Sequence, residues 1–285
     1  CQGTSNVLAG MAYGIPVFGT MAHSFIMSYP KELDAFRAFA KTFPHKSTLL
    51  IDTYNDIAGA EKAVIVAKEL EAKGFRLGGV RLDSGDLAET SKKVRQILDD
   101  NGLEYVKIFA SGDLDEFKLA ELQADGAKID AFGVGTKMGT SADRPYLDVI
   151  YKLSETMTSP GVFSPIMKLS KDKNTLPGRK QVYRFKDATG NFERDIIALA
   201  GEKMGGEPLL VKVMDQGKLT YQLPTLNEIR SCTAENLSRL PEPYKKLTNA
   251  QQYPVELSIN LQELIKTLKQ QLTQNEISTH NHNHR

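Results

Sequence analysis

The first half of the chain alternates short apolar runs with longer helix-like stretches. Five runs rich in β-branched residues end in clusters of Gly, Ser, Thr, Asp or His. They cover residues 15–18, 48–51, 78–80, 105–110 and 129–132. A strand, a crossover helix and a parallel strand together need roughly 30 residues, because no tight turn can join parallel neighbours. The spacing therefore predicts an α/β fold built on a parallel sheet.

Three stretches between these runs have apolar residues at helical spacing. They cover residues 56–73, 87–101 and 114–125. Each is followed or ended by a glycine suited to a left-handed residue at the C-terminus, and Asn55 or Asp56 is placed to cap the first helix. The pairs Asp86 with Glu89 and Asp113 with Glu116 have the spacing of a capping box. We therefore expect three crossover helices.

Several polar residues and glycines stand where the predicted strands end. The carboxyl ends of parallel strands face the same side of a sheet, so residues far apart in sequence meet at one rim. We expect this rim to contain Thr20, His23, Asp52, Asp83, Ser111, Asp113, Gly133 and Gly135. An active site is the natural interpretation.

The pattern changes in the second half of the chain. Residues 147–153 read as one more strand, and turn signals then replace helical periodicity. Further short strands are expected at 181–185, 195–200 and 208–214, in a smaller mixed or antiparallel region that ends in a helix with apolar positions from Leu257 to Leu272. The predicted organisation is a partial barrel over 1–154, a C-terminal region over 155–272 and a disordered polar tail over 273–285.

Composition narrows the class of protein. Among 285 residues, 36 basic side chains nearly balance 35 acidic ones, so neither nucleic acid nor a membrane surface is expected as a partner. Cys1 and Cys232 are the only cysteines, too few for a disulfide framework, which favours a cytoplasmic location. No apolar run approaches the roughly 20 residues of a membrane span.

His23, Arg81 and Asp83 are the side chains best suited to chemistry. His23 lies three residues after a Gly-Thr strand end, where it can be catalytic or simply pack. Arg81 and Asp83 are two residues apart and share a strand face, where a guanidinium suits phosphate and a carboxylate suits ribose hydroxyls or magnesium. Asp52 can orient His23 or help bind a cation, or it can be an N-cap or a buried hydrogen-bonding residue.

The glycine-rich segment 133–136 offers backbone N–H groups with little steric cover. Phosphate is the natural ligand, because barrels often bind phosphate at their late strand-to-helix loops. The alternative is a tight turn that uses glycine for conformation alone.

Six motifs together resemble the nicotinate phosphoribosyltransferase family. They are residues 3–7, 19–23, 81–86, 111–113, 132–136 and 177–181. The resemblance covers residues 1 to about 260, from mid-barrel to the C-terminus of that family. Because the chain begins abruptly at Cys1, we expect a fragment that lacks the amino-terminal domain.

The resemblance implies a partly open, TIM-like α/β barrel with a second, smaller domain. It also implies that nicotinate and phosphoribosyl pyrophosphate give nicotinate mononucleotide and pyrophosphate, a step of NAD biosynthesis coupled to ATP hydrolysis with Mg²⁺. In that family the histidine is transiently phosphorylated, a role that falls on His23. A homodimer is implied for the full-length protein.

The same resemblance assigns substrate contacts. Arg81 and Asp83 would hold the phosphoribosyl unit with the catalytic histidine beside them. The remaining substrate-binding residues would be Thr4, Ser5, Thr20, Asp52, Ser84, Gly112, Asp113, Gly133, Gly135 and Thr136. The alternatives are a nicotinamide or quinolinate phosphoribosyltransferase, or an inactive truncated fragment that only binds phosphate.

Overall fold

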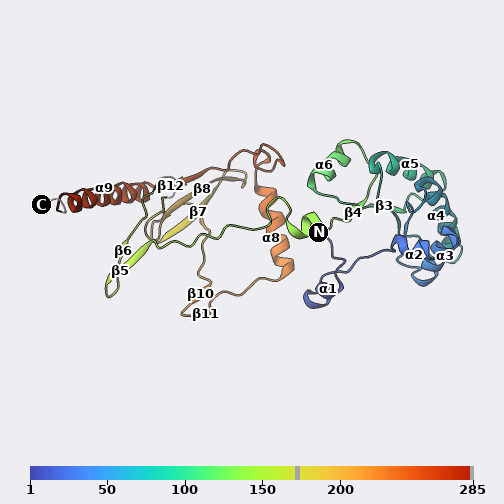
Figure 1. Cartoon of the computed structure of the whole chain (residues 1–285), viewed down its shortest axis with the longest axis horizontal. Helices are drawn as coiled ribbons and strands as arrows, with labels where there is room; N and C mark the ends of the chain where they lie inside the picture. Colours follow the sequence, from blue (N-terminus) through green and yellow to red (C-terminus); the bar gives the residue numbers. More distant parts are fainter. Residues whose placement is uncertain (171–173, 283–285) are drawn as a thin grey trace. The chain divides into compact units, whose positions relative to one another are not determined.

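A computed structural model describes the backbone of residues 1–170 and 174–282, with side chains to residue 274. The chain forms two compact units, Cys1–Leu147 and Asp148–Arg285 (Figure 1). Each unit is described by itself.

The first unit is built on a four-stranded parallel sheet in the order β1-β2-β3-β4. The strands are β1 (Thr48–Leu50), β2 (Gly79–Leu82), β3 (Lys107–Ala110) and β4 (Ala131–Phe132). The crossover helices between them are α4 (Asp56–Glu71), α5 (Leu87–Asp100) and α6 (Glu116–Ala124) (Figure 1). The predicted parallel α/β arrangement is therefore confirmed for this part of the chain.

The helix ends follow local side-chain chemistry. Asn55 caps α4 by accepting the Ala58 N–H at 2.8 Å, and Asp86 caps α5 by accepting the Glu89 N–H at 3.0 Å. The expected cap at Asp113 is wrong, because α6 starts two residues later and Asp115 accepts the Lys118 N–H at 2.9 Å. The left-handed glycines expected at the three helix ends are Gly74, Gly102 and Gly126.

A hydrophobic core joins the sheet to its helices. Leu50, Val80, Leu82 and Ile108 of the first three strands have no exposed surface. They pack with one face of α4 and α5 in a single buried cluster. This core holds the strand ends in place, which is the condition for a shared rim.

The amino-terminal part of this unit is helical, with one predicted strand missing. Its helices are α1 (Val7–Tyr13), α2 (His23–Met27) and α3 (Glu32–Thr42). The strand expected at 15–18 is reduced to one isolated bridge between Thr4 and Val17, so it does not join the sheet. A short helix, α7 (Thr136–Thr140), follows β4. In the described residues β1 and β4 are the sheet edges, and the barrel remains a prediction.

The second unit contains a mixed sheet in the order β12-β8-β7-β9. Its strands are β7 (Lys180–Lys186), β8 (Phe192–Leu199), β9 (Glu207–Pro208) and β12 (Val255–Leu257). Two hairpins add β5 (Glu155–Ser159) with β6 (Val162–Pro165), and β10 (Met214–Asp215) with β11 (Lys218–Leu219). The remaining elements are α8 (Leu226–Arg239), the 3₁₀ helix η1 (Glu242–Tyr244) and α9 (Ile259–His282).

Three expectations for this half are corrected. The strand predicted at 208–214 is not continuous, because only its ends enter β9 and β10. Helix α8, closed by a capping box between Thr225 and Glu228, was not anticipated. The backbone is helical as far as His282, where a disordered tail was expected from residue 273; residues 283–285 lie outside the described part of the chain.

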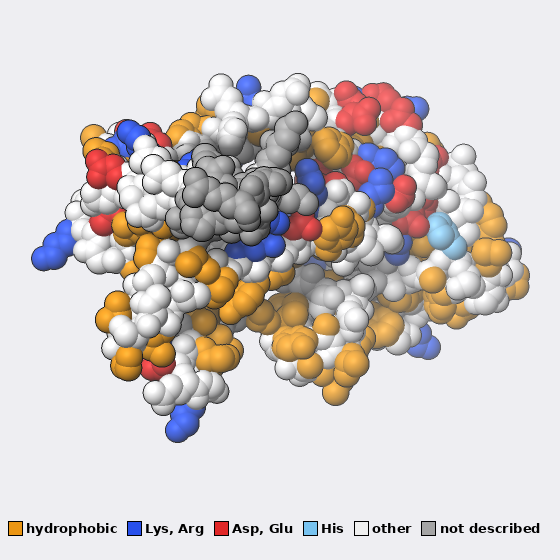
Figure 2. Space-filling model, turned by 60° about the vertical axis from the view of Figure 1, so that its left-hand side comes forward, with side chains coloured by type: hydrophobic (Ala, Val, Ile, Leu, Met, Phe, Trp, Pro, Cys, Tyr) orange, Lys and Arg blue, Asp and Glu red, His pale blue; other side chains and the backbone are white. Residues whose placement is uncertain are grey.

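The strand expected at 147–153 is also absent. Its backbone pairs with no strand in the described residues. Its apolar side chains are also open to solvent, with Val149 90% exposed and Tyr151 95% exposed. Figure 2 shows hydrophobic side chains exposed on the surface, with basic and acidic side chains interspersed. A β-branched run alone does not make a strand, because a strand also needs a neighbour for its backbone hydrogen bonds.

Among the described residues, no helix has the length and apolar character required to cross a membrane.

Gly59 is the point where α4 packs closely against Ile51, the residue that follows β1. A Cβ at this position would lie 2.0 Å from the Ile51 carbonyl oxygen. Replacing a helical glycine by alanine ordinarily stabilises by up to about 1 kcal/mol. Here we expect Gly59→Ala to destabilise the protein by about 2 kcal/mol, because the backbone must move. The free energy of unfolding in urea measures the effect.

Gly139→Ala in α7 is the matched control, since a Cβ there meets nothing within 4 Å. It should leave stability unchanged or slightly improved. A Gly59→Ala variant as stable as the unsubstituted protein would contradict the packing described.

Candidate active site

The strand register aligns four functional positions along the carboxyl edge of the sheet. Leu50 pairs with Arg81, Leu82 with Ala110, and Ala110 with Phe132. The residues that follow these pairs are therefore neighbours in space. In sheet order they are Asp52, Asp83, Ser111 and Gly133.

Arg81 is the centre of a hydrogen-bond network at this edge. Its Nη2 lies 2.7 Å from Asp83 Oδ1, and its Nε donates to Ser111 Oγ at 2.8 Å. Its Nη1 donates to Thr20 Oγ1 at 2.9 Å, which ties the segment before α2 to the sheet. Ser111 also donates to Asp83 Oδ1. The guanidinium and the carboxylate are thus held in a defined orientation before any ligand binds.

Asp83 is kept ionised by this network. Burial opposes the charge, but the hydrogen bond from Ser111 and the ion pair with Arg81 outweigh it and lower the pKa of this carboxyl from its ordinary value of 3.8. An ionised carboxylate can accept hydrogen bonds from ribose hydroxyls and can stabilise positive charge.

His23 stands at the start of α2, beside Asp83. Its Nδ1 lies 3.0 Å from Thr53 Oγ1, and its Nε2 lies 3.6 Å from Asp83 Oδ2. The second distance is longer than a hydrogen bond. With 38% of its side chain exposed, the imidazole is accessible to a ligand while both ring nitrogens have a defined neighbour.

The contacts of Asp52 differ from one role that the sequence suggested, which was to orient His23. Asp52 does not orient His23, because that contact is made by Thr53. Instead its Oδ2 accepts the Asp83 N–H at 2.7 Å and the Ser84 hydroxyl at 2.8 Å. Its Oδ1 is buried and has no hydrogen-bond partner in the described part of the chain. Asp52 therefore fixes the conformation of the loop that carries Asp83, and its Oδ1 has no hydrogen-bond partner among the described residues.

A pocket of about 290 Å³ adjoins this network. It is lined by Gly112, Asp113, Leu114, Gly133, Gly135, Thr136 and Lys137. A Cβ on Gly112 would lie 2.2 Å from the Asp83 carbonyl oxygen, so the pocket and the Arg81 network share a wall. The expected phosphate loop thus lies next to the candidate catalytic side chains.

Thr4 and Ser5 are the two candidate residues outside this arrangement. Thr4 pairs with the 16–18 segment, donating its N–H to the Pro16 carbonyl at 2.9 Å. Among the described residues, no hydrogen bond or ion pair joins either of them to His23, Arg81 or Asp83. The other candidate residues meet at the rim.

One residue that completes the network, Thr53, was missing from the residues expected at the rim. Ser111 was expected there, and it directly follows Ala110, which pairs with Leu82, so the strand register places it beside Asp83. Thr53 had no comparable signal, because its contact depends on where α2 brings His23.

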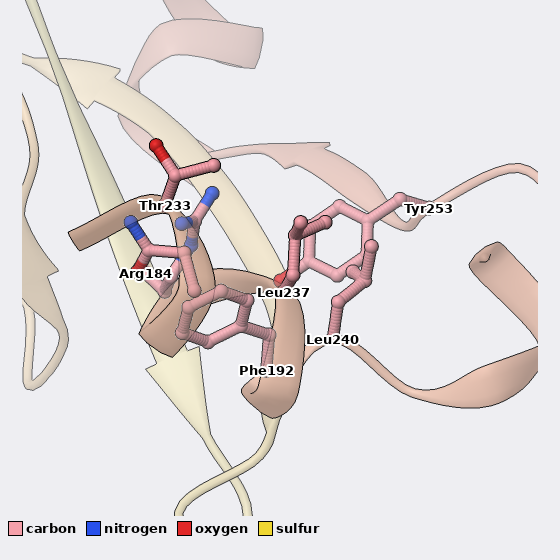
Figure 3. A pocket seen from close by; sticks show the side chains of 7 residues that line it. Arg184, Phe192, Thr233, Leu237, Leu240 and Tyr253 are labelled. Atoms are coloured by element: carbon pink, nitrogen blue, oxygen red, sulfur yellow. The ribbon is translucent and has the colours of Figure 1, made fainter. Parts of the chain in front are cut away.

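A second pocket, of about 320 Å³, belongs to the other unit (Figure 3). Its Arg184 is paired with Asp195 at 2.8 Å and stacks 4.3 Å from the Phe192 ring centroid. Burial, followed by the charge of Asp195, raises the pKa of the Tyr253 phenol to about 12. The pocket is mostly apolar, and its lining includes none of the predicted site residues.

Comparison with known proteins identifies the class. The fold resembles the crystal structure of human nicotinic acid phosphoribosyltransferase, with a TM-score of 0.75 and 29% identity over 94% of this chain and 65% of that one. It also resembles nicotinate-nucleotide pyrophosphorylase from Pyrococcus furiosus, with a TM-score of 0.63 and 30% identity over 84% and 59% of the chains.

Sequence similarity agrees. The model of the nicotinate phosphoribosyltransferase (NAPRTase) family matches residues 1–179, and that of the nicotinate phosphoribosyltransferase C-terminal domain matches residues 204–265. The chain therefore belongs to the nicotinate phosphoribosyltransferase family.

Two curated relatives show what share of a family member's length this chain covers. Nicotinate phosphoribosyltransferase pncB2 of Mycobacterium tuberculosis is 44% identical over 90% of this chain and 54% of its own length. Nicotinate phosphoribosyltransferase of Bacillus subtilis is 39% identical over 90% of this chain and 57% of its own length. The chain thus spans little more than half the length of these relatives.

Ser111→Ala tests whether the network holds Asp83 in its ionised form. We expect the pKa of Asp83 to rise toward or above 3.8, because burial would then be opposed only by Arg81 and, to a smaller extent, by His23. Carboxyl carbon NMR shifts across an acid titration measure it. A lowered native pKa adds stability above pH 4 that is lost on acidification, so the variant should lose less stability in acid.

Ser84→Ala is the control, since Ser84 donates to Asp52 and not to the Asp83 carboxylate. It should leave the Asp83 titration unchanged. An equal shift in both variants would show that the Ser111 hydroxyl has no specific role.

Proposed function

We propose that this chain carries the phosphoribosyl-transfer site of a nicotinate phosphoribosyltransferase. The observation that carries the proposal is the continuous arrangement of His23, Arg81 and Asp83 with the glycine-lined pocket. Family membership adds the substrate: nicotinate and phosphoribosyl pyrophosphate would give nicotinate mononucleotide and pyrophosphate.

The rim suits a phosphoribosyl group. The pocket beside Gly112 and Gly133 would take the 5′-phosphate, with Thr136 at its edge. Asp83 would accept hydrogen bonds from the ribose hydroxyls, because it is ionised and partly exposed. Arg81, already held by Thr20 and Ser111, would offer its positive charge to the pyrophosphate.

The transfer step needs charge stabilisation at two places. The nitrogen lone pair of nicotinate would attack C1 of the ribose while the bond from C1 to the pyrophosphate oxygen breaks. Positive charge develops on the sugar, where the Asp83 carboxylate stabilises it. Negative charge develops on the departing pyrophosphate, which Arg81 neutralises in part.

Magnesium would neutralise the rest of that charge. Among the described side chains, no group of three or more His, Cys, Asp or Glu residues could form a metal cage. That agrees with an ion held mainly by substrate phosphates and water, with one or two protein carboxylates. Asp52 fits this part, because its Oδ1 lies at the rim without a hydrogen-bond partner.

ATP coupling would act through His23. A neutral ring nitrogen would attack the γ-phosphorus of ATP, the bond to the ADP oxygen would break, and the imidazole would lose its N–H proton. Water would later release the group as inorganic phosphate. The added negative charge would lie within a few ångströms of Asp83 and Arg81, because the imidazole lies 3.6 Å from the Asp83 carboxylate. Phosphorylation can therefore change the electrostatics of the pyrophosphate site.

The direct test is an assay with purified protein, phosphoribosyl pyrophosphate, Mg²⁺ and either nicotinate or nicotinamide, with and without ATP. We expect nicotinate mononucleotide as the product, formed faster with ATP. Preferential turnover of nicotinamide, or binding of phosphoribosyl pyrophosphate without any transfer, would contradict the proposed function. The homodimer is expected of the full-length protein, and sedimentation of that protein would test it.

His23→Asn tests the phosphorylated group. With γ-³²P ATP, we expect the unsubstituted protein to acquire acid-labile phosphate and the variant to acquire none. ATP should also cease to accelerate the variant. His45→Asn is the control, because His45 is exposed against Phe75 and contacts no rim residue among those described. Equal labelling of the His23→Asn variant would exclude this histidine as the acceptor.

A further inference from the structure

Lys137 is a charged residue of the glycine-lined pocket that neither the sequence-based set nor the family assignment includes. It lies in α7, one residue after Thr136, and its side chain is 41% exposed. Its ammonium is the only basic group among the described residues that line this pocket. A dianionic phosphate in the pocket would therefore have this lysine as its nearest lining cation.

Asp115 holds the lysine in place. Lys137 Nζ lies 3.0 Å from Asp115 Oδ2, and the Asp115 side chain is 12% exposed. The hydrogen bond to Asp115 raises the pKa of Lys137, so the lysine stays charged at neutral pH. Asp115 is itself fixed, because its Oδ1 caps α6 through the Lys118 N–H.

The backbone of the pocket has spare donors. In the described part of the chain the N–H groups of Gly112 and Gly135 donate to no protein acceptor, whereas the Gly133 N–H donates to the Ala110 carbonyl at 2.8 Å. Two free N–H groups and one ammonium on one small pocket make a suitable set for a phosphate, which offers several acceptor oxygens.

The lysine of this ion pair is 41% exposed, so solvent competes for its charge and weakens the pair. A hydrogen bond from an ammonium to a doubly charged phosphate is stronger than one between neutral groups. Exchange of Asp115 for phosphate is therefore favourable once the ligand enters.

We propose that Lys137 binds the 5′-phosphate of the phosphoribosyl substrate and that Asp115 is its resting partner, released in part when the phosphate binds. The identity of the substrate rests on the proposed function. The role of Lys137 in binding a sugar phosphate does not depend on the transfer reaction.

Two substitutions in the pair should act in opposite directions. Lys137→Met removes the cation and keeps an unbranched side chain of similar length, so affinity for ribose 5-phosphate should fall about tenfold. Asp115→Asn keeps an oxygen that can cap α6 but removes the competing charge, so affinity should rise about threefold. If the pair only stabilised the fold, both substitutions would weaken binding or neither would change it.

Lys118→Met is the matched control. Lys118 also contacts an aspartate, because its Nζ lies 3.6 Å from Asp113 Oδ2 and donates to the Asp113 carbonyl at 2.8 Å, but Lys118 itself does not line the pocket. Its removal lowers the net charge of the same region by the same amount. We expect less than a twofold change in affinity, which separates a direct contact from a general electrostatic effect.

The experiment is isothermal titration of the whole chain and its three variants with ribose 5-phosphate, with thermal unfolding recorded for each. The expected order of affinity is Asp115→Asn, unsubstituted, then Lys137→Met, with Lys118→Met equal to the unsubstituted protein. Equal losses in both lysine variants, a loss in Asp115→Asn, or no binding by the unsubstituted chain would overturn the proposal. Lys137-dependent binding without nicotinate turnover would support it while contradicting the proposed function.

Discussion

Parallel pairing of four strands is the constraint on which the rest of the site depends. Hydrogen bonds between β1, β2, β3 and β4 fix the register, and the register sets which strand-end residues are neighbours. Asp83 lies beside Ser111 for this reason, although 28 residues separate them. The buried leucine, isoleucine and valine residues keep the strands in that register, so the core and the chemistry are linked directly.

The polar network at the rim compensates the charges of two partly buried side chains. A carboxylate and a guanidinium that are each about a quarter exposed need partners, and Arg81, Asp83, Ser111 and Thr20 satisfy one another. The arrangement is organised before a ligand arrives, which reduces the cost of orienting charges during a reaction. Asp52 stabilises this network by accepting a hydrogen bond from the backbone N–H of Asp83.

Sequence patterns located the parts of this fold that depend on local information. The crossover helices and their caps at Asn55 and Asp86 follow from side chains within a few residues, and the strands of the first unit follow from short apolar runs. The pattern failed where pairing partners decide the outcome. Residues 147–153 have the composition of a strand but no neighbour in the described chain, and 15–18 has only one bridge.

The functional site also contains residues that local sequence patterns could identify and residues whose contacts depend on tertiary packing. His23, Arg81 and Asp83 could be selected because strand ends of a parallel sheet converge, whereas Thr53 could not, because its contact requires the position of α2. Asp113 was interpreted as a helix cap, but the backbone turns at this residue with a positive φ of 49° and leaves capping to Asp115. A shift of two residues in a helix start cannot be resolved from spacing when both positions are aspartate.

The most direct measurement is the structure of the protein crystallised with phosphoribosyl pyrophosphate and Mg²⁺. The rim described above predicts the 5′-phosphate in the pocket lined by Gly112, Gly133 and Gly135, with the ribose against Asp83 and the pyrophosphate toward Arg81 and His23. A ligand bound instead at the Arg184 pocket, or on the opposite edge of the parallel sheet, would contradict the assignment of this rim as the active site.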